Sequence, residues 1–570
     1  MTPDASAPND LAGQFAAIDA ALRGPAPLAP DLGPRIAEAR RRWPQNLGLM
    51  LLEGTWFEKT RELAQAEACY RAALAQHPNQ FWPALRLTEL LLSQRRAEEG
   101  ARVFAERVWG SSAPEAARKA LLSRISTALT DLSRRREFLQ SLLRDTPEDR
   151  LVLPKLATLS LRERDRAEAE RLLDRARQYG PLPPESQMLM LELLITATRF
   201  DEAFELAMQL RARQPERAEF TRRAIQAAHF SLRHREMIEL LRDALTRWPG
   251  DWMLAFRYNR STCPMAADRE LFERLTAAAA TVTDERWWFQ YAVACLRHLC
   301  TVEAMNILDR VQAGSPVAAM AMPLRAALKL YPAATWRGAR GVVNDPAQDV
   351  QVVRTPGARA TLILLAGQAG GLGYLPMSHA DALLARLPVN AIYLRDLNNR
   401  SFISGVRSLG PDAASMIVQL KALCAPLGVP VITYGSSLGG LSAIRVGVML
   451  DAHAAISFAG PIHVGADTAE EAPMRSGSGG AKTTIFSHLT QADLGLLEMI
   501  RAAPRTRIHQ CFGSGFAPDV ADAELLKPLP NVTLHPIEHC ADHFVIEHMI
   551  ADGSFFEVIE EAIAMAPPAP

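Results

Sequence analysis

Residues 429–450 read VPVITYGSSLGGLSAIRVGVML, and this stretch decides the fold of the second half of the chain. Its first six residues are largely apolar and β-branched, which is typical of a buried strand. Its last ten residues carry apolar side chains at helical spacing. Between the two stands GSSLGG, with Ser437 near its centre. The stretch therefore predicts a strand, a sharp turn and a helix, with a serine exposed at the turn.

Further apolar runs and helical stretches alternate through the rest of this half. The runs are nearly continuous, as strands buried on both faces of a sheet require. Strands that alternate with helices form a mostly parallel sheet flanked by helices. The predicted strands are residues 350–353, 361–365, 390–394, 429–434, 454–458, 507–512 and 532–537, and the predicted helices are 379–387, 412–428, 441–451, 519–529 and 543–565.

The turn around Ser437 has the neighbours that a reactive serine needs. Gly435 and Gly439 leave space where a Cβ would clash in a turn tight enough to expose the hydroxyl. A phosphate-binding loop is the alternative, but no lysine follows the glycines as that chemistry requires. Strand, G-x-S-x-G and helix in this order resemble the nucleophile elbow of the α/β-hydrolase family. The resemblance covers about residues 345–566 and implies that Ser437 is a catalytic nucleophile.

The same resemblance implies an acid and a histidine, in that order, after the last two strands. Asp519 stands at the turn after the next-to-last strand, where a helix N-cap is expected, and Asp522 falls one turn inside that helix. His543 lies six residues past the last strand, and His539 lies two residues past it. We expect Asp519 and His543 to complete the triad, with Asp522 and His539 as the alternatives. His543 would take the serine proton, and Asp519 would orient the imidazole.

The oxyanion of a tetrahedral intermediate needs hydrogen-bond donors already in place. The N–H of Leu438, directly after Ser437, is one candidate. The other is expected from the loop AGQAGGLG, residues 366–373, at Gln368 or else at Ala369. This loop departs from the HGGG type of lipases, and a plain flexible glycine loop is the competing interpretation.

Two more segments belong to the predicted edge of the sheet. The polar residues after the strand 390–394 either shape a substrate pocket or only cap the strand; they are Asp396, Asn398, Asn399 and Arg400. Residues 460–505 are long for one crossover, which predicts either a small lid or a disordered loop.

Prolines recur with a period of 34 residues in the first half of the chain. They are Pro44, Pro78, Pro147, Pro181, Pro215, Pro249 and Pro316. The interval from Pro78 to Pro147 is two periods plus one residue, and the interval from Pro249 to Pro316 is two periods less one residue. Apolar residues at spacings of four and three precede each proline, as Ala66, Tyr70 and Ala73 precede Pro78. Such spacing marks one face of a helix, which the proline then ends. The period predicts stacked helical hairpins, each burying its apolar face against its neighbours.

This pattern resembles a tetratricopeptide repeat (TPR) array of about nine units. The resemblance implies a concave groove for a protein or peptide partner, or a surface for self-association. Aromatic residues at this spacing are either groove anchors or inter-repeat core; they are Trp82, Trp109, Trp248, Trp252, Trp287 and Trp288. The predicted domains are an N-terminal segment with a short helix (1–30), the repeats (31–335), a linker (336–349) and the hydrolase domain (350–566).

Composition excludes several classes of function. Lysine plus arginine and aspartate plus glutamate both number 63, so net charge gives no reason to expect nucleic acid or an anionic membrane as partner. No apolar run is long enough for a membrane span, and no signal peptide is evident. The seven cysteines are scattered without a C-x-x-C pair, which favours a reducing, cytoplasmic location. No metal-ligand spacing such as H-E-x-x-H occurs, so neither metal nor cofactor is expected.

The sequence thus predicts a multi-domain protein, an all-α TPR-like superhelical solenoid followed by an α/β-hydrolase domain. The predicted activity is that of a serine hydrolase acting on a small acyl or ester substrate through a covalent acyl-enzyme. Two alternatives stay open. The same site would also serve an acyltransferase or a peptidase, or the hydrolase-like domain is inactive and the chain is a TPR scaffold.

Overall fold

The computed structural model describes residues 11–24, 28–147, 149–163, 165–337, 340–368, 370–462, 495–538 and 540–565. By contacts the chain divides into two units, Met1–Leu193 and Leu194–Pro570. The predicted boundary at 336–349 divides the chain differently, by fold type, because the last repeats pack on the sheet domain. Among the described residues, no helix is both long and apolar enough to cross a membrane.

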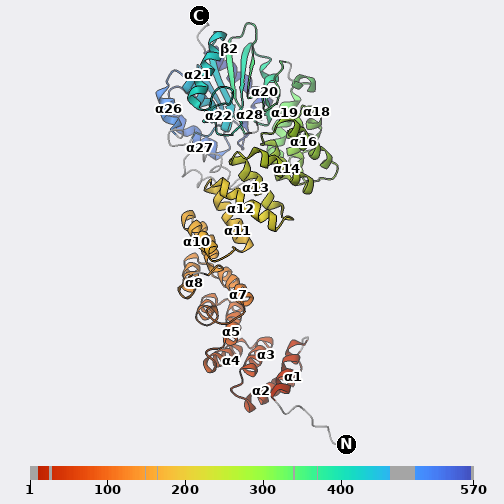
Figure 1. Cartoon of the computed structure of the whole chain (residues 1–570), viewed down its shortest axis with the longest axis vertical. Coiled ribbons are helices and arrows are strands. Elements are labelled where there is room, and N and C mark those ends of the chain that lie inside the picture. The colour runs from red at the N-terminus through yellow and green to blue at the C-terminus, as the bar shows by residue number, and fades with distance from the viewer. Residues whose placement is uncertain are drawn as a thin grey trace. The chain divides into compact units, whose positions relative to one another are not determined.

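The first unit consists of helices joined by short turns and stacked in succession (Figure 1). Its helices are α1 (Leu11–Arg23), α2 (Leu32–Arg42), α3 (Leu47–Lys59), α4 (Leu63–Gln76), α5 (Phe81–Ser93), α6 (Ala97–Phe104), α7 (Glu115–Ala128), α8 (Leu132–Asp145), α9 (Val152–Arg162) and α10 (Arg166–Gln178), and α11 (Pro184–Thr196) crosses the division. Helix α1 packs on α2 and α3 through Ile18 and Leu22, so the first helical pair begins before residue 31.

The repeat pattern explains this packing. In α4, Ala66, Tyr70 and Ala73 are fully buried, and the helix ends two residues before Pro78. The corresponding residues of α2, α10 and the helices beyond are buried in the same way. In the unit before Pro147, Arg135 takes the place of a small apolar residue; it lies half-buried and donates to the carbonyl oxygen of Leu129, the C-cap of α7. The arginine thereby satisfies a helix end where other units bury a small apolar residue.

The one residue in excess between Pro78 and Pro147 has a visible place in the fold. A π-helical turn, Ala105–Trp109, follows α6 directly. A π turn holds one more residue than an α turn, so it absorbs a single insertion without shifting the neighbouring helices. Trp109 at its end is buried, and its indole N–H donates to Thr146. The interpretation as core therefore holds for Trp109, as it does for the buried Trp287, whereas Trp82 is exposed.

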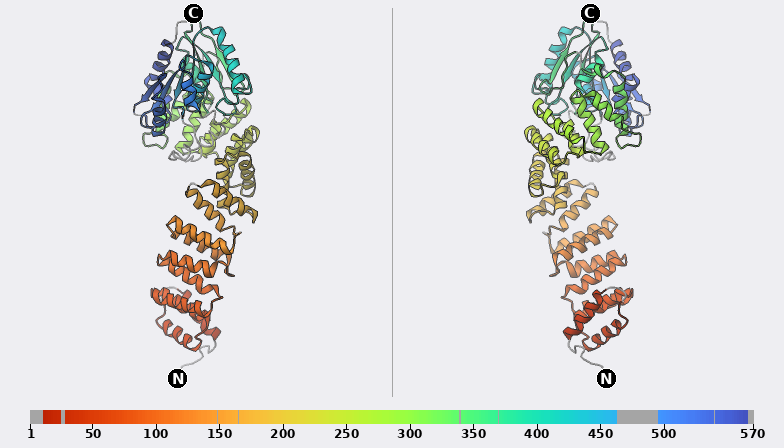
Figure 2. Two further views of the ribbon diagram at one scale, coloured as in Figure 1. Left: turned by 90° about the vertical axis from the view of Figure 1, so that its left-hand side faces the viewer. Right: turned by 90° about the vertical axis from the view of Figure 1, so that its right-hand side faces the viewer.

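The second unit continues the helical hairpins and adds the sheet domain (Figure 2). Its repeat helices are α12 (Phe200–Arg213), α13 (Ala218–Phe230), α14 (His234–Arg247), α15 (Trp252–Asn259), α16 (Met265–Ala278), α17 (Glu285–Arg297), α18 (Thr301–Leu308) and α19 (Ala318–Lys329). Helices α15 and α18 have only eight residues each. They fall in the interval from Pro249 to Pro316, where the period loses a residue.

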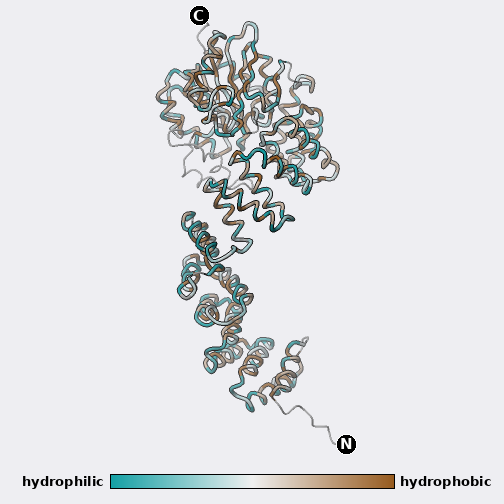
Figure 3. Tube along the Cα trace, in the orientation of Figure 1, coloured by the Kyte–Doolittle hydropathy of each residue, from teal (hydrophilic) through white to brown (hydrophobic). Residues whose placement is uncertain are grey.

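The described part of the sheet has seven strands in the order β1-β5-β2-β6-β7-β8-β9. They are β1 (Val350–Val353), β2 (Ala360–Leu365), β5 (Val389–Leu394), β6 (Val431–Ser436), β7 (Ala454–Phe458), β8 (Arg507–Gly513) and β9 (Val532–Ile537). β1 pairs antiparallel with β5 at one edge, and all the other pairs are parallel. The predicted strands and the mostly parallel sheet are confirmed. Figure 3 shows apolar residues concentrated on these strands, whose central members are fully buried.

Helices cover both faces of the sheet. On one face lie α21 (Ala413–Cys424), α22 (Leu438–Leu450), α26 (Leu496–Ala502) and α27 (Ala517–Leu526), whose apolar residues share two clusters with the strands. Further helices complete the fold: α20 (Met377–Leu384), α28 (Val545–Asp552) and α29 (Ser554–Ala564). The predicted single helix 543–565 is two helices, because Gly553 adopts a left-handed φ of 91° between them.

The repeats and the sheet domain share a core inside the second unit. His379 of α20 is fully buried, stacks on Trp336 and hydrogen-bonds Thr301 of α18 at 3.0 Å. Tyr374 packs its ring edge-on against Phe289 of α17. Helix α19 packs along α28. These contacts place the last repeat helices beside the loops that carry the candidate site.

Candidate active site

Ser437 occupies a strained turn between β6 and α22. Its φ of 54° and ψ of −120° lie outside the regions that residues with a side chain normally adopt. A Cβ at Gly439 would lie 2.3 Å from the carbonyl oxygen of Leu365, and one at Gly435 would lie 2.3 Å from that of Gly439. Only glycine fits at both positions. The turn therefore holds Ser437 at the carboxyl end of the sheet, as the nucleophile-elbow pattern predicts.

Ser437, His543 and Asp519 form one hydrogen-bonded chain. His543 Nε2 lies 2.9 Å from Ser437 Oγ, and His543 Nδ1 lies 3.0 Å from both carboxylate oxygens of Asp519. Asp519 is 5% exposed, and the His543 side chain is 28% exposed. With Nδ1–H donating to the carboxylate, Nε2 is the nitrogen that can accept the serine proton. A buried acid and a partly open imidazole suit proton transfer to and from a bound substrate.

The alternatives for the acid and the histidine are placed differently. Asp522 lies half-buried one turn further along α27, and the structure pairs His543 with Asp519. His539 lies outside the described residues. Asp519 is the third residue of α27, and the expectation of an N-cap was wrong. Phe516 is the N-cap, because Pro518 fits the first turn of a helix and starts it earlier.

The loop after β2 is ordered by its own hydrogen bonds. The N–H of Gly367 donates to Gly371 O at 3.0 Å, and two short strands, β3 (Gly371–Leu372) and β4 (Leu375–Pro376), close it as a hairpin. The described residues of the loop thus form a hairpin with defined hydrogen bonds. Gln368 lies in this turn and lines the same cavity as Ser437. Ala369, the alternative donor, lies outside the described residues.

Two main-chain donors are available for an oxyanion. In the described part of the chain, the N–H groups of Leu438 and Gln368 donate to no carbonyl or side chain. Leu438 is the first residue of α22, so its N–H also lies at the positive end of the helix dipole. This arrangement can stabilise negative charge next to Ser437.

A cavity of about 80 Å³ opens at Ser437. Its wall includes residues of the repeat helices α15 and α17, whose part in the site no sequence motif indicates. They are Phe256, Asn259, Arg260, Gln290 and Val293. Tyr374 and Phe544 complete the wall, with their rings 4.9 Å apart between centroids. One signal in the sequence could have revealed this contribution, namely the loss of the 34-residue period between Pro249 and Pro316.

Some residues of the loop after β5 cap the end of the strand, and others line a cavity. Asp396 is buried and accepts hydrogen bonds from the N–H groups of Asn398, Arg400 and Phe402, at 2.6 to 3.0 Å. It therefore caps the turn. Burial raises the pKa of its carboxyl group, although the three hydrogen bonds act to lower it. Asp396 and Asn399 also line a second cavity, of about 50 Å³, beside the one at Ser437.

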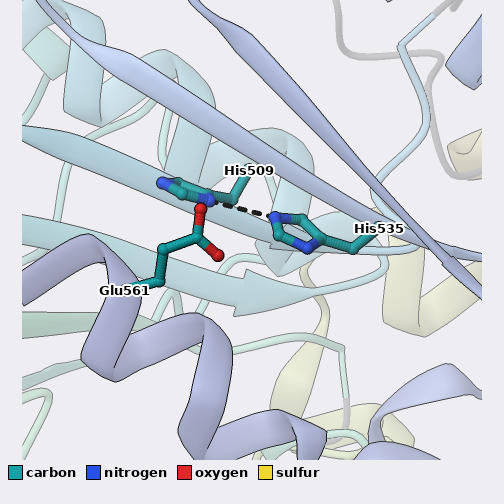
Figure 4. A group of neighbouring side chains, drawn as sticks. All are labelled: His509, His535 and Glu561. Carbon is teal, nitrogen blue, oxygen red and sulfur yellow. Dashed lines mark hydrogen bonds between the residues drawn. The ribbon is translucent and has the colours of Figure 1, made fainter. Parts of the chain in front are cut away.

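Two groups of described residues have the chemistry of metal ligands. His509, His535 and Glu561 bring three ligand atoms within 4.8 Å of one another (Figure 4). His509 Nδ1 and His535 Nε2 already share a hydrogen bond of 3.0 Å. These residues lie on β8, β9 and α29, whereas Asp519 and His543 lie past the carboxyl ends of the same strands. The second group is Cys540, Asp542 and His548, close in sequence to His543. Neither group includes a member of the hydrogen-bonded chain at Ser437.

No family model matches this sequence, and no curated protein is similar to it. The similar solved structures are of two kinds. One is a tetratricopeptide repeat protein from Parabacteroides merdae, with 13% identity over 44% of this chain and 98% of that chain, at a TM-score of 0.25. The other kind includes a carboxylesterase structure of Nitrososphaera gargenis, with 12% identity over 38% of this chain and 93% of that chain, at a TM-score of 0.26. An α/β hydrolase from a lagoon-sediment metagenome of Mar Chica, Morocco, has 17% identity over 37% of this chain and 93% of that chain, at a TM-score of 0.25.

Proposed function

We propose that this protein is a serine hydrolase, an esterase-like acyl hydrolase that works through a covalent acyl-enzyme. The observation that carries the proposal is the hydrogen-bonded chain from Ser437 through His543 to Asp519. A hydroxyl is a poor nucleophile at neutral pH and needs an adjacent base to become reactive. The strained turn at Ser437 adds support, since backbone strain of this kind is held at functional sites.

The proposed chemistry uses only side chains and main-chain donors of this chain. Ser437 Oγ attacks the carbonyl carbon of the substrate as its proton passes to His543 Nε2. Asp519 stabilises the imidazolium, and the N–H groups of Leu438 and Gln368 bind the oxyanion. The imidazolium then protonates the leaving alcohol, which departs as the acyl-enzyme forms. Water, deprotonated by His543, hydrolyses the acyl-enzyme and regenerates the serine.

The repeats are proposed to bind a protein or peptide partner, or a second copy of this chain. The support is architectural, because stacked helical hairpins present extended surfaces that suit such binding. We also propose a cytoplasmic location. All seven cysteines are free thiols, which fits a reducing compartment.

A fluorophosphonate probe tests the proposed nucleophile directly. The probe phosphonylates an activated serine, and intact mass identifies the adduct. We expect labelling of the parent protein, and its loss in Ser437→Ala and His543→Ala. Ser436→Ala is the matched control, because it removes the neighbouring hydroxyl, for which the structure shows no part in the chain of hydrogen bonds. Labelling that survives in Ser437→Ala would refute the assignment, and a folded parent that does not label would favour the scaffold alternative.

Acyl transfer to an acceptor other than water uses the same steps up to the acyl-enzyme. The partly buried cavity favours this second candidate, since limited access for water lets another nucleophile compete. Once labelling is established, product analysis with an added alcohol or amine separates the two. Ester or amide products would indicate transfer, and free acid alone would indicate hydrolysis.

A further inference from the structure

Helix α15 of the repeats ends beside the candidate nucleophile. Its last residue is Asn259 and its C-cap is Arg260, and both line the cavity that contains Ser437 and His543. Because α15 has only eight residues, the chain leaves the helix at this point and runs along the sheet domain to Pro264, the N-cap of α16. Ser261 and Thr262 of this segment line the adjoining cavity.

Arg260 is held in place over the cavity. Its guanidinium carbon lies 4.1 Å from the ring centroid of Phe256, one helical turn earlier. Its Nη1 donates to the side-chain oxygen of Gln368 at 3.2 Å. Stacking on a ring and one hydrogen bond leave other N–H groups of the guanidinium available, because the group carries five. The arginine is thus fixed beside the predicted oxyanion donor with hydrogen-bonding capacity to spare.

The guanidinium has no carboxylate to neutralise it. In the described part of the chain, no ion pair joins Arg260 to an aspartate or glutamate, and the cavity lining contains neither residue type. Burial lowers the pKa of Arg260, as expected for a cation that has lost water without gaining an anion. An unpaired, desolvated charge is costly for a fold, so its retention next to a nucleophile points to a ligand that completes it.

A second arginine extends the positive surface. The cavity with Arg395 shares Asn259, Val293, Gly367, Gln368 and Tyr374 with the cavity at Ser437, so the two are adjacent. Arg395 donates to the carbonyl oxygens of Asn344 and Gly370, and its buried Nε has no partner among the described residues. The one carboxylate in that lining, Asp396, is already occupied by three main-chain N–H groups.

We propose that Arg260, contributed by the repeats, binds an anionic group of the substrate, so that the enzyme prefers esters that carry a carboxylate or phosphate near the scissile bond. This inference rests on the proposed hydrolase function and adds the substrate class to it. The repeats then build part of the site in addition to any partner binding, and Arg260 determines specificity without taking part in bond making.

Paired ester substrates test the proposal. The first pair carries the charge on the acyl side, 4-nitrophenyl hydrogen glutarate against its methyl ester. The second carries it on the alcohol side, 4-acetoxybenzoate against its methyl ester. We expect the parent to have a kcat/KM higher by about tenfold to a hundredfold for the anionic member of one pair, the range that a hydrogen bond to a charged group gives. The pair that shows the preference reveals on which side of the scissile bond Arg260 lies.

Three variants isolate the arginine. Arg260→Met removes the charge and should abolish the preference, because kcat/KM falls about tenfold to a hundredfold more for the anionic ester than for its neutral partner. Arg260→Lys retains the charge without the planar donor set and should keep part of the preference. Arg96→Met is the control, because it makes the same change in the first unit, at an ion-paired side chain that lines neither cavity. It should keep the preference.

The outcomes separate this inference from the proposed function. If the parent is labelled at Ser437 but shows no preference within either pair, the anion site is refuted and the hydrolase remains. If Arg260→Met lowers the turnover of anionic and neutral esters equally, the arginine only positions Gln368, and the inference fails in the same way. If a folded parent neither labels nor turns over any ester, the proposed function fails, and the substrate class falls with it.

Discussion

Paired arginines of the first unit differ from Arg260 of the second unit in their partners, although other arginines of the second unit, such as Arg233 and Arg242, are paired as well. In the first unit, Arg96 donates to Glu67 and Glu99 at 2.6 and 2.7 Å, and Arg40 donates to Glu53 at 2.9 Å. The pairs with Glu67 and Glu53 join two helices of the array, whereas the pair with Glu99 lies within the first turn of α6. In the second unit, Arg260 of α15 has no carboxylate partner among the described residues. Paired arginines stabilise a repeat scaffold modestly, whereas the unpaired one lies in the cavity at Ser437. The difference separates scaffold from site within one repeat architecture.

The two units also differ in where the repeats depart from the 34-residue period. The extra residue of the first unit is absorbed inside the helices by the π turn 105–109. The missing residue of the second unit coincides with the short helices α15 and α18, where the repeats meet the sheet domain. In this chain, the repeat with the short helix α15 is therefore one that contacts the sheet domain beside Ser437.

The largest effect is expected in the second unit, at the chain of hydrogen bonds from Ser437 through His543 to Asp519. Asp519→Asn leaves the shape of the side chain nearly unchanged but favours the wrong imidazole tautomer, so we expect the rate of fluorophosphonate labelling to fall by about 10³- to 10⁴-fold. Asp522→Asn, one turn along the same helix, should label at the parental rate. Equal losses in both variants would indicate a general disturbance of α27 and would overturn the assignment of Asp519.

The second effect concerns the interface between the repeats and the sheet domain. Burial lowers the pKa of His379 to about 4, whereas an unfolded histidine titrates near 6.5. Between these values only the unfolded chain takes up this proton, so acidification from pH 7 to pH 4 removes about 3 kcal/mol of stability through His379. In His379→Asn, the loss of unfolding free energy over that interval should therefore be smaller by about 3 kcal/mol.

Urea titrations of the parent and the variant at both pH values measure this difference. The comparison between proteins is needed because burial raises the pKa of Glu547 to about 7, which acts in the opposite sense in the same interval. Glu547 is present in both proteins and cancels. An unchanged pH dependence in the variant would show that His379 does not titrate as a buried neutral group.

Gly54 in the first unit and Gly439 in the second unit are similarly crowded, but by different kinds of atoms. A Cβ at Gly54 in α3 would lie 2.4 Å from the ring of Tyr70, and its three nearest atoms all belong to that side chain. A Cβ at Gly439 would meet the main chain of Leu365 and Gly367, which holds the oxyanion loop. We expect Gly54→Ala to lower the unfolding free energy by about 1–3 kcal/mol with normal labelling. Gly439→Ala should reduce labelling at least tenfold, and normal labelling of that variant would contradict the proposed elbow.

The sequence was sufficient for the elements whose signals are local. The sheet strands, the buried small residues of the repeats and the turn at Ser437 all depend on residues close together in the chain, and each is found where it was predicted. Asp519 and His543 could be chosen because the order of strands fixes which loops meet at the edge of a sheet. The choice between Asp519 and Asp522 followed from a one-turn difference in helix position.

Other features depend on contacts between distant segments, which sequence patterns do not report. The place of Arg260 beside Gln368 joins residues 108 positions apart. The hairpin of β3 and β4 has strands of two residues, too short for any periodicity. Gly553 splits the last helix through its left-handed backbone, although an isolated glycine in an apolar helical pattern does not by itself predict a break.

The smallest effect is expected when the same substitution is made at Arg96 and at Arg260. Arg96→Met breaks ion pairs whose side chains are partly exposed, so it should lower the melting temperature only slightly and leave ester turnover unchanged. Arg260→Met removes an unpaired, desolvated charge, so stability should be equal or higher while the preference for anionic esters is lost. Thermal melting and the paired ester assay on both variants give the four values. If Arg260→Met destabilises the fold more than Arg96→Met and spares the preference, the two arginines are alike, and the division between scaffold and site does not run along α15.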